Sequence, residues 1–139
     1  MSSAAVAYEV IQRGLGSILL VEDELFIRVL LADELRDEGY QVIEASNAEE
    51  ALEVLRGVVP DAILSDVNMP GSIDGLGLLA AVKVAFPGLP VIIMSGHVHP
   101  GDAVAAGAHQ FVAKPFRIGV IVEAVREALE NLSERRCDP

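Results

Sequence analysis

The sequence of 139 residues predicts a doubly wound α/β domain built around a parallel sheet. Five short apolar runs recur along the chain, and each is followed by a segment whose apolar residues have helical spacing. Gly and Pro punctuate the segments. Short strands that alternate with helices favour right-handed β–α–β units, whose parallel sheet is covered by helices on both faces.

The first unit is a compact apolar strand followed by a helix. Residues 18–21 are all apolar, and they run directly into Glu22 and Asp23. A helical pattern then continues to about Glu38, where Gly39 provides a stop. The acidic pair is therefore expected at the carboxyl end of the first strand.

The second unit is a short strand and a capped helix. Residues 41–45 form the strand. Asn47 is a favourable N-cap, and Glu50 follows three positions later as in a capping box. The helix is expected to end near Gly57.

The third unit points most directly to a function. Residues 62–64 are apolar and lead to Asp66, and Pro70 breaks the chain soon afterwards. A buried parallel strand has this continuous apolar pattern, and open α/β sheets bind ligands at the carboxyl ends of their strands. A lone Asp at a strand end can also do no more than cap the next turn. The following helix is expected from Gly75 to about Phe86.

The last two units repeat the pattern, and their strands run into Ser95 and Lys114. Ile121, Val125 and Ala128 lie three or four positions apart in the final helix. The predicted ranges are 91–94 and 110–113 for the strands, and 102–107 and 118–132 for the helices.

The chain divides into a domain and two short ends. We expect an N-terminal extension at residues 1–16, the domain at 17–132 and a polar C-terminal tail at 133–139. Apolar residues at helical spacing within residues 4–11 leave two interpretations of the extension open: a short accessory helix or a frayed segment.

Composition and charge exclude several classes of partner. The formal net charge of -11 disfavours direct nucleic-acid binding, which requires a basic face. No apolar run approaches the roughly 20 residues that span a bilayer, and no signal peptide is recognisable. Cys137 is the only cysteine, so an internal disulfide is impossible. A cytoplasmic protein without membrane contact is expected.

Polar residues stand at the carboxyl ends of four predicted strands, and a parallel sheet brings these ends to one edge. Glu22, Asp23 and Asp66 would form an acid cluster with the hard oxygen ligands that suit Mg²⁺. Lys114 offers a positive charge that can bind phosphate, and Ser95 offers a hydroxyl. Such a set favours phosphoryl transfer, where catalysis is mostly positioning and charge neutralisation.

Asp66 is the best candidate nucleophile in this set. The sequence has no GxSxG elbow, no Walker A sequence and no HExxH motif. An Asp carboxylate can itself attack phosphorus and form an aspartyl phosphate.

With these residues in view, the chain resembles the receiver domains of response regulators, the phospho-acceptor modules of two-component signalling. The resemblance covers about residues 17–132 and keeps the family's order of motifs. The motifs are Glu22-Asp23, Asp66-Val-Asn68-Met-Pro70, Asp74-Gly75, Ser95-Gly96 and Lys114-Pro115-Phe116.

The resemblance implies a phospho-acceptor and a metal site. Asp66 would take a phosphoryl group from a histidine kinase or a histidine phosphotransfer protein. Asp23, Asp66 and the backbone carbonyl of Asn68 would bind Mg²⁺, with Mn²⁺ as an alternative ion, and Glu22 would assist through water. It also implies a flavodoxin-like (βα)5 fold with strand order 2-1-3-4-5.

The resemblance also implies a switch. Lys114 would pair with the phosphoryl group, and the Ser95 hydroxyl would move to bond one of its oxygens. Ser95 and Phe111 are the switch positions, although Phe111 has no hydroxyl where the family often has Tyr. The peptide between Lys114 and Pro115 is expected to be cis.

Two further features stand out near this site. The loop from Pro70 to Gly75 is about two residues longer than usual, which would alter access to the phosphate or the surface that faces the kinase. His97 and His99 form an HxH pair. A transition-metal site there is disfavoured, whereas His97 lies where the family tunes the lifetime of its phosphoryl group.

These observations together indicate a stand-alone receiver that switches a protein–protein surface formed by the fourth helix, fifth strand and fifth helix. Its downstream target is unidentified, and a monomer or weak dimer is expected. Three alternatives stay open: a phosphate sink for a shared kinase, a non-phosphorylated scaffold, and a Mg²⁺-dependent aspartyl-phosphate phosphatase. The phosphatase is disfavoured because its usual Asp-x-Asp motif is absent from the first strand.

Overall fold

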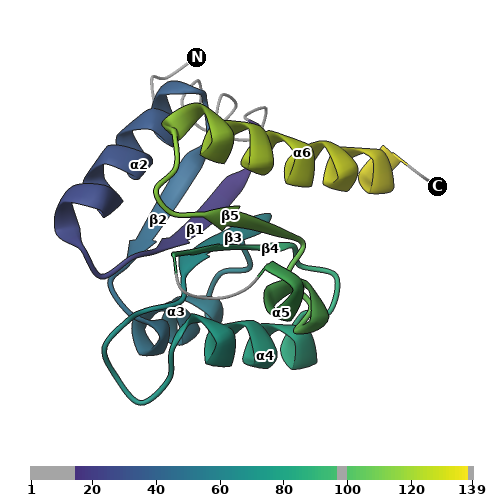
Figure 1. Cartoon of the computed structure of the whole chain (residues 1–139). Helices are drawn as coiled ribbons and strands as arrows, with labels where there is room; N and C mark the ends of the chain where they lie inside the picture. The colour runs from purple at the N-terminus through teal and green to yellow at the C-terminus, as the bar shows by residue number, and fades with distance from the viewer. Residues whose placement is uncertain (1–14, 97–99, 138–139) are drawn as a thin grey trace.

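The computed structural model describes residues 15–96 and 100–137, where strands and helices alternate along the chain (Figure 1). The predictions for residues 4–11 and for His97 and His99 lie outside this part. The strands are β1 (Ser17–Val21), β2 (Gln41–Ala45), β3 (Ala62–Asp66), β4 (Val91–Ser95) and β5 (Gln110–Ala113). The helices are α2 (Leu25–Asp37), α3 (Ala48–Leu55), α4 (Gly75–Ala85), α5 (Pro100–Ala105) and α6 (Ile118–Cys137).

The strands form one parallel sheet in the order β2-β1-β3-β4-β5, which confirms the predicted order. The register places Val21 beside Ser65, Asp66 beside Met94, and Ser95 beside Ala113. The carboxyl ends of four strands therefore meet at one edge, as the constellation of polar residues requires.

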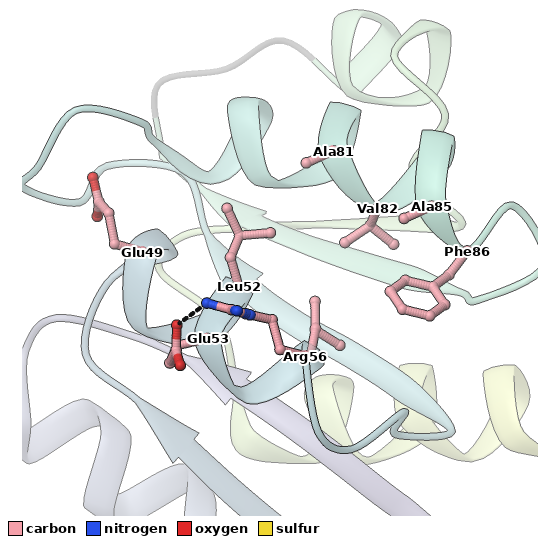
Figure 2. A pocket seen from close by; sticks show the side chains of 9 residues that line it. Glu49, Leu52, Glu53, Arg56, Ala81, Val82, Ala85 and Phe86 are labelled. Atoms are coloured by element: carbon pink, nitrogen blue, oxygen red, sulfur yellow. Dashed lines mark hydrogen bonds and ion pairs between the residues drawn. The ribbon is translucent and has the colours of Figure 1, made fainter.

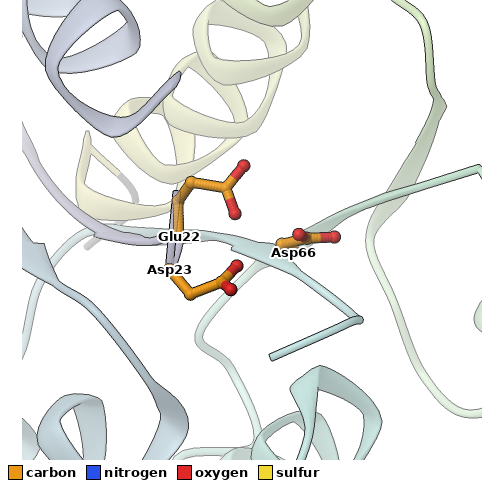
Figure 3. Close-up of side chains that lie close together, drawn as sticks. All are labelled: Glu22, Asp23 and Asp66. Carbon is orange, nitrogen blue, oxygen red and sulfur yellow. The ribbon is translucent and has the colours of Figure 1, made fainter. Parts of the chain in front are cut away.

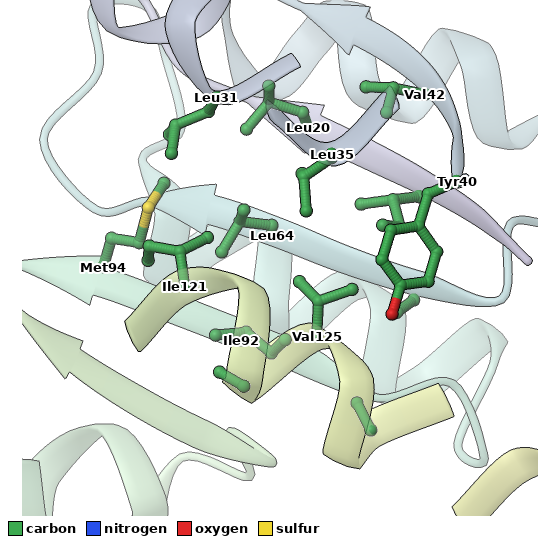
Figure 4. Packing of buried hydrophobic residues seen from close by; sticks show 14 of the residues in the cluster. Leu20, Leu31, Leu35, Tyr40, Val42, Leu64, Ile92, Met94, Ile121 and Val125 are labelled. Carbon is green, nitrogen blue, oxygen red and sulfur yellow. The ribbon is translucent and has the colours of Figure 1, made fainter. Parts of the chain in front are cut away.

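Helices cover both faces of the sheet and bury two apolar layers. Alternate residues of a strand point to opposite faces, so Leu20 and Leu64 pack under α2 and α6 (Figure 4). Leu19 and Ile63 pack under α3, α4 and α5 on the other face. All residues of β3 and β4 are buried, because both strands lie inside the sheet and are covered on both sides.

Two helices begin at side-chain caps, of which Asn47 was predicted. The Asn47 side chain accepts a hydrogen bond of 2.7 Å from the Glu50 N–H, and the Asp74 side chain accepts one of 2.9 Å from the Gly77 N–H. The Glu50 carboxylate accepts a bond from the Ser46 hydroxyl at 2.8 Å. These caps hold the starts of α3 and α4, the two helices that flank the loop after β3.

Two predicted helix boundaries were wrong. Helix α6 continues past residue 132 to Cys137, so most of the predicted tail is helical. Residues 133–137 contain neither Gly nor Pro, and Glu and Arg favour helices, so the polarity of this segment does not make it a coil. Helix α5 begins at Pro100, two residues earlier than predicted. Proline suits the first turn of a helix, so Pro100 does not prevent this earlier start.

Candidate functional site

Three carboxylates meet at the carboxyl edge of the sheet (Figure 3). Glu22 and Asp23 follow β1 and extend toward Asp66, the last residue of β3. One oxygen from each residue lies within 4.8 Å of the others. Glu22 is 0% exposed and Asp66 is 5% exposed, whereas Asp23 is exposed. The cluster is therefore open to solvent on the Asp23 side and closed on the Glu22 side.

Lys114 brings a positive charge to the cluster. Its Nζ lies 3.1 Å from Asp66 Oδ2 and 3.3 Å from Glu22 Oε1. Its backbone N–H donates to the Ser95 carbonyl at 3.0 Å, which extends the ladder between β4 and β5 by one residue and fixes the base of the side chain. The peptide to Pro115 is cis, as the resemblance implied.

Burial and neighbouring charges shift the pKa values of Glu22 and Lys114. Burial raises the pKa of Glu22 from its usual 4.5 to about 7, the adjacent Asp66 carboxylate adds to the rise, and Lys114 opposes it. Burial acts to lower the pKa of Lys114, but the hydrogen bonds and charges of Asp66 and Glu22 outweigh it and raise the pKa. Lys114 therefore stays cationic at neutral pH, while the acid cluster attracts a proton or a metal cation.

The donor set fits a small divalent cation. Glu22 Oε2 is buried, and no described residue donates a hydrogen bond to it. Among the described residues, three carboxylates share the space with one ammonium group, so negative charge is in excess. Hard oxygen donors that leave room for water are what Mg²⁺ requires.

The remaining predicted site residues lie on β4, on β5 and in the loop after β3. Ser95 ends β4 and is 1% exposed. Asn68 is exposed in the loop after β3, and metal ligation by its carbonyl stays a prediction. Phe111 on β5 is half-buried against the apolar layer under α3, α4 and α5, so its role as a switch also stays a prediction.

Sequence reasoning missed two residues that form hydrogen bonds with the segments after β1 and β3. Arg28 on α2 donates from Nη1 to the Glu22 carbonyl at 2.9 Å, while its Nε lies 3.4 Å from Glu44 Oε1. Glu49 on α3 accepts hydrogen bonds from Ser72 in the loop after β3. Neither had a local signal, because an Arg and a Glu on helices are ordinary surface residues until the fold places their partners.

A groove between α3 and α4 is lined by none of the residues of the acid cluster (Figure 2). Apolar side chains dominate its lining, and Glu53 and Arg56 form an ion pair of 3.4 Å on it. Separately, none of the described helices is long and apolar enough to cross a membrane.

The chain is similar to many receiver-containing proteins. A family model described as response regulator receiver domain matches residues 18–126. The nitrogen assimilation regulatory protein NtrX of Azorhizobium caulinodans is 42% identical over 123 residues, which are 86% of this chain and 27% of that protein. The DNA-binding transcriptional regulator NtrC of Escherichia coli K12 is 39% identical over 124 residues, or 87% of this chain and 26% of that protein. The chain thus spans about a quarter of the length of these relatives.

Solved structures agree with this likeness. The receiver domain of NtrX from Brucella abortus has a TM-score of 0.77 at 37% identity, covering 81% of this chain and 98% of that one. A CheY-like receiver domain protein from Methanospirillum hungatei has a TM-score of 0.79 at 26% identity, covering 86% of this chain and 97% of that one. With the family model matched over most of the chain and the fold in agreement, this chain belongs to the response regulator receiver domain family.

Proposed function

We propose that Asp66 accepts a phosphoryl group from a histidine kinase or a histidine phosphotransfer protein, in a reaction that requires Mg²⁺. The observation that carries this proposal is the position of Asp66. Its carboxylate ends a buried strand within 3.1 Å of Lys114 Nζ, and shares its surroundings with Glu22 and Asp23. Membership of the receiver family supports the same role.

The transfer is a displacement at phosphorus. A carboxylate oxygen of Asp66 attacks, and its new P–O bond forms as the P–N bond of the donor phosphohistidine breaks. The electron pair of that bond leaves with the imidazole nitrogen, which then takes a proton. Lys114 moves from pairing with Asp66 to pairing with a phosphoryl oxygen, and the Ser95 hydroxyl donates to another.

The acid cluster supplies the metal ligands in this proposal. Asp23, Asp66 and the Asn68 carbonyl hold Mg²⁺, with Glu22 assisting through water, and Mn²⁺ is an alternative ion. The bound cation neutralises the charge that develops on the transferred group. Two observations support this assignment: Glu22 Oε2 is buried without a donor among the described residues, and the cluster has an excess of carboxylates.

A hollow beside Lys114 is the proposed contact for the phosphohistidine donor. Side chains of α2 and of the segment after β5 line this hollow, including Leu30 and Phe116. Leu25 and Phe26 at the start of α2 are 60% and 85% exposed. An apolar surface next to the acceptor suits a protein donor, because the donor's histidine must be brought to Asp66 in a fixed orientation.

The proposed output is a protein contact on the face of α5, β5 and α6, with the domain acting as a switch. Phosphorylation adds about −1.5 to −2 charges at the carboxyl edge, and closure of Lys114 and Ser95 shifts a two-state equilibrium. Val104 on α5 and Val120 on α6 are 58% and 50% exposed, which supports a contact there. To shift this equilibrium almost completely, phosphorylation must stabilise one state over the other by about 5.5 kcal/mol.

Intact mass after incubation with acetyl phosphate and Mg²⁺ tests the acceptor. We expect one phosphoryl mass to be added, and expect EDTA or Asp66→Ala to prevent it. Asp61→Asn is the matched control, because Asp61 precedes the same strand at its other end. If neither a phosphoryl adduct nor beryllofluoride binding is found in the wild type, the acceptor proposal fails and the scaffold alternative replaces it.

A further inference from the structure

One acidic side chain, Glu49, holds the loop that joins β3 to α4. Its Oε1 accepts hydrogen bonds from the Ser72 N–H at 2.7 Å, the Ser72 hydroxyl at 2.7 Å and the Ile73 N–H at 3.3 Å. Glu49 lies in the first turn of α3, 23 residues before Ser72. In Figure 2 its carboxylate lies apart from the Glu53–Arg56 ion pair.

The loop is shaped to receive this carboxylate. Gly71 has a φ of +118°, a conformation that favours glycine, and a Cβ there would lie 2.6 Å from Glu49 Oε2. The hydrogen bonds from Ser72 lower the pKa of Glu49, so the accepting group is ionised at neutral pH. An acid that only favoured the start of α3 would need no such fit in a distant loop.

Both ends of the loop are tied to the strand that carries Asp66. The Gly75 N–H donates to the Val67 carbonyl at 3.0 Å, and a Cβ on Gly75 would collide with the Asp66 carbonyl oxygen. Asp74 caps α4 at this end. The loop of residues 68–74 is thus fixed at its two ends by the sheet and by α4, and in its middle by Glu49.

We propose that Glu49 is a positioning residue that holds the loop whose Asn68 carbonyl would bind a cation at the acid cluster. The part concerning the cation rests on the proposed function. Ordering an exposed loop costs conformational entropy, and a loop that is already ordered spares ligand binding that cost. Glu49 therefore strengthens Mg²⁺ binding through Ser72 and Ile73 without touching the ion.

Two measurements on Glu49→Ala test the proposal. We expect the Ser72 and Ile73 amides to exchange about 10-fold faster with solvent, because both lose their acceptor. Calorimetric titration with Mg²⁺ alone should give a dissociation constant about 10-fold weaker, the lower end of the range for residues that support a metal ligand. Acetyl phosphate uptake at saturating Mg²⁺ should stay within about twofold of the wild type, since only cation binding is weakened.

Matched variants separate this role from general effects on α3. Glu53→Ala removes an acid that is 72% exposed on the same helix. It should change neither the amide exchange of Ser72 and Ile73 nor the dissociation constant for Mg²⁺. Ser72→Ala keeps the backbone hydrogen bonds to Glu49 and should give an intermediate effect. Gly71→Ala should also loosen the loop, because the new methyl group strains the backbone at a φ of +118° and displaces the Glu49 carboxylate.

The outcomes distinguish this inference from the proposed function. Unchanged amide exchange in Glu49→Ala would show that Glu49 does not restrain the loop. Faster exchange with an unchanged Mg²⁺ affinity would show that Glu49 does not position a metal ligand. If the wild type takes up no phosphoryl group while both shifts are observed, the acceptor function fails and the positioning role of Glu49 stands.

Discussion

Acidic residues at the two ends of the sheet are held in different ways. At the amino end, the Asp61 side chain accepts a hydrogen bond from the Ser17 N–H at 2.9 Å and approaches the Ser17 hydroxyl at 3.4 Å. The Asp61 N–H donates in return to the Ser17 carbonyl at 2.8 Å. At the carboxyl end, Glu22 shares Lys114 with Asp66, and Glu22 Oε2 has no donor among the described residues.

The difference separates a structural acid from acids that bind ligands. Asp61 is satisfied by donors at the start of β1, so it fastens β1 to the start of β3. Glu22, Asp23 and Asp66 carry more negative charge than Lys114 balances, and two of them are buried. Excess buried charge costs free energy unless a cation or proton joins it, which makes the carboxyl end the place for chemistry.

The largest expected effect comes from removing the ammonium group that pairs with Asp66 and Glu22. Lys114→Met should destabilise the protein by about 3 kcal/mol at pH 8 in EDTA, because it leaves buried carboxylates without a partner. The loss should be smaller at pH 6, since the pKa of Glu22 is already raised to about 7 and its carboxyl is then largely protonated. Urea unfolding measures both values. Lys83→Met is the control, and an unchanged stability of Lys114→Met at pH 8 would contradict this view of the site.

A smaller effect should follow the titration of Glu22 in EDTA. Its pKa in the folded state, about 7, is above the usual 4.5, so its contribution to stability is fully present below pH 4.5 and is lost as the pH rises through 7. Glu22→Gln removes that loss, and its stability relative to the wild type should rise between pH 5 and pH 8. One pKa unit is about 1.4 kcal/mol, and we expect a rise on the order of 2 kcal/mol over this range of pH.

Mg²⁺ tests whether ionised carboxylates cause the difference in stability between the wild type and Glu22→Gln. Because a cation compensates the ionised carboxylates, excess Mg²⁺ should stabilise the wild type more than Glu22→Gln and shrink the difference at pH 8. A difference between the two proteins that is independent of pH in EDTA would show that burial of Glu22 does not destabilise its charged form.

The smallest effect is expected at the amino end. Asp61→Ala should lower the free energy of unfolding by about 1–2 kcal/mol, because the Ser17 N–H loses its charged acceptor. Asp61→Asn keeps a side-chain oxygen and should recover part of the loss. Thermal unfolding and acetyl phosphate uptake are measured on the same samples, and uptake should be unchanged. A fall in uptake would mean that the two ends of the sheet are coupled.

Much of the fold was predictable because its signals are local. Apolar runs mark the strands, Asn47 marks a helix start, and Asp66 ends a run that is typical of a buried strand. Parallel pairing then requires that residues at strand ends share an edge, so the meeting of Asp66 with Lys114 followed without coordinates. The end of α6 was missed because polarity reports exposure and not backbone conformation.

The sequence by itself thus determined the fold class, the strand-end constellation and the family that these motifs resemble. Only the tertiary structure decided that Glu22 is fully buried while Asp23 beside it is exposed, and that Glu49 reaches the loop at Ser72. The physical reason is that hydrophobic periodicity is a property of each segment alone. A polar contact between distant segments leaves no periodic trace, and it exists only once the packed sheet and helices bring the two groups together.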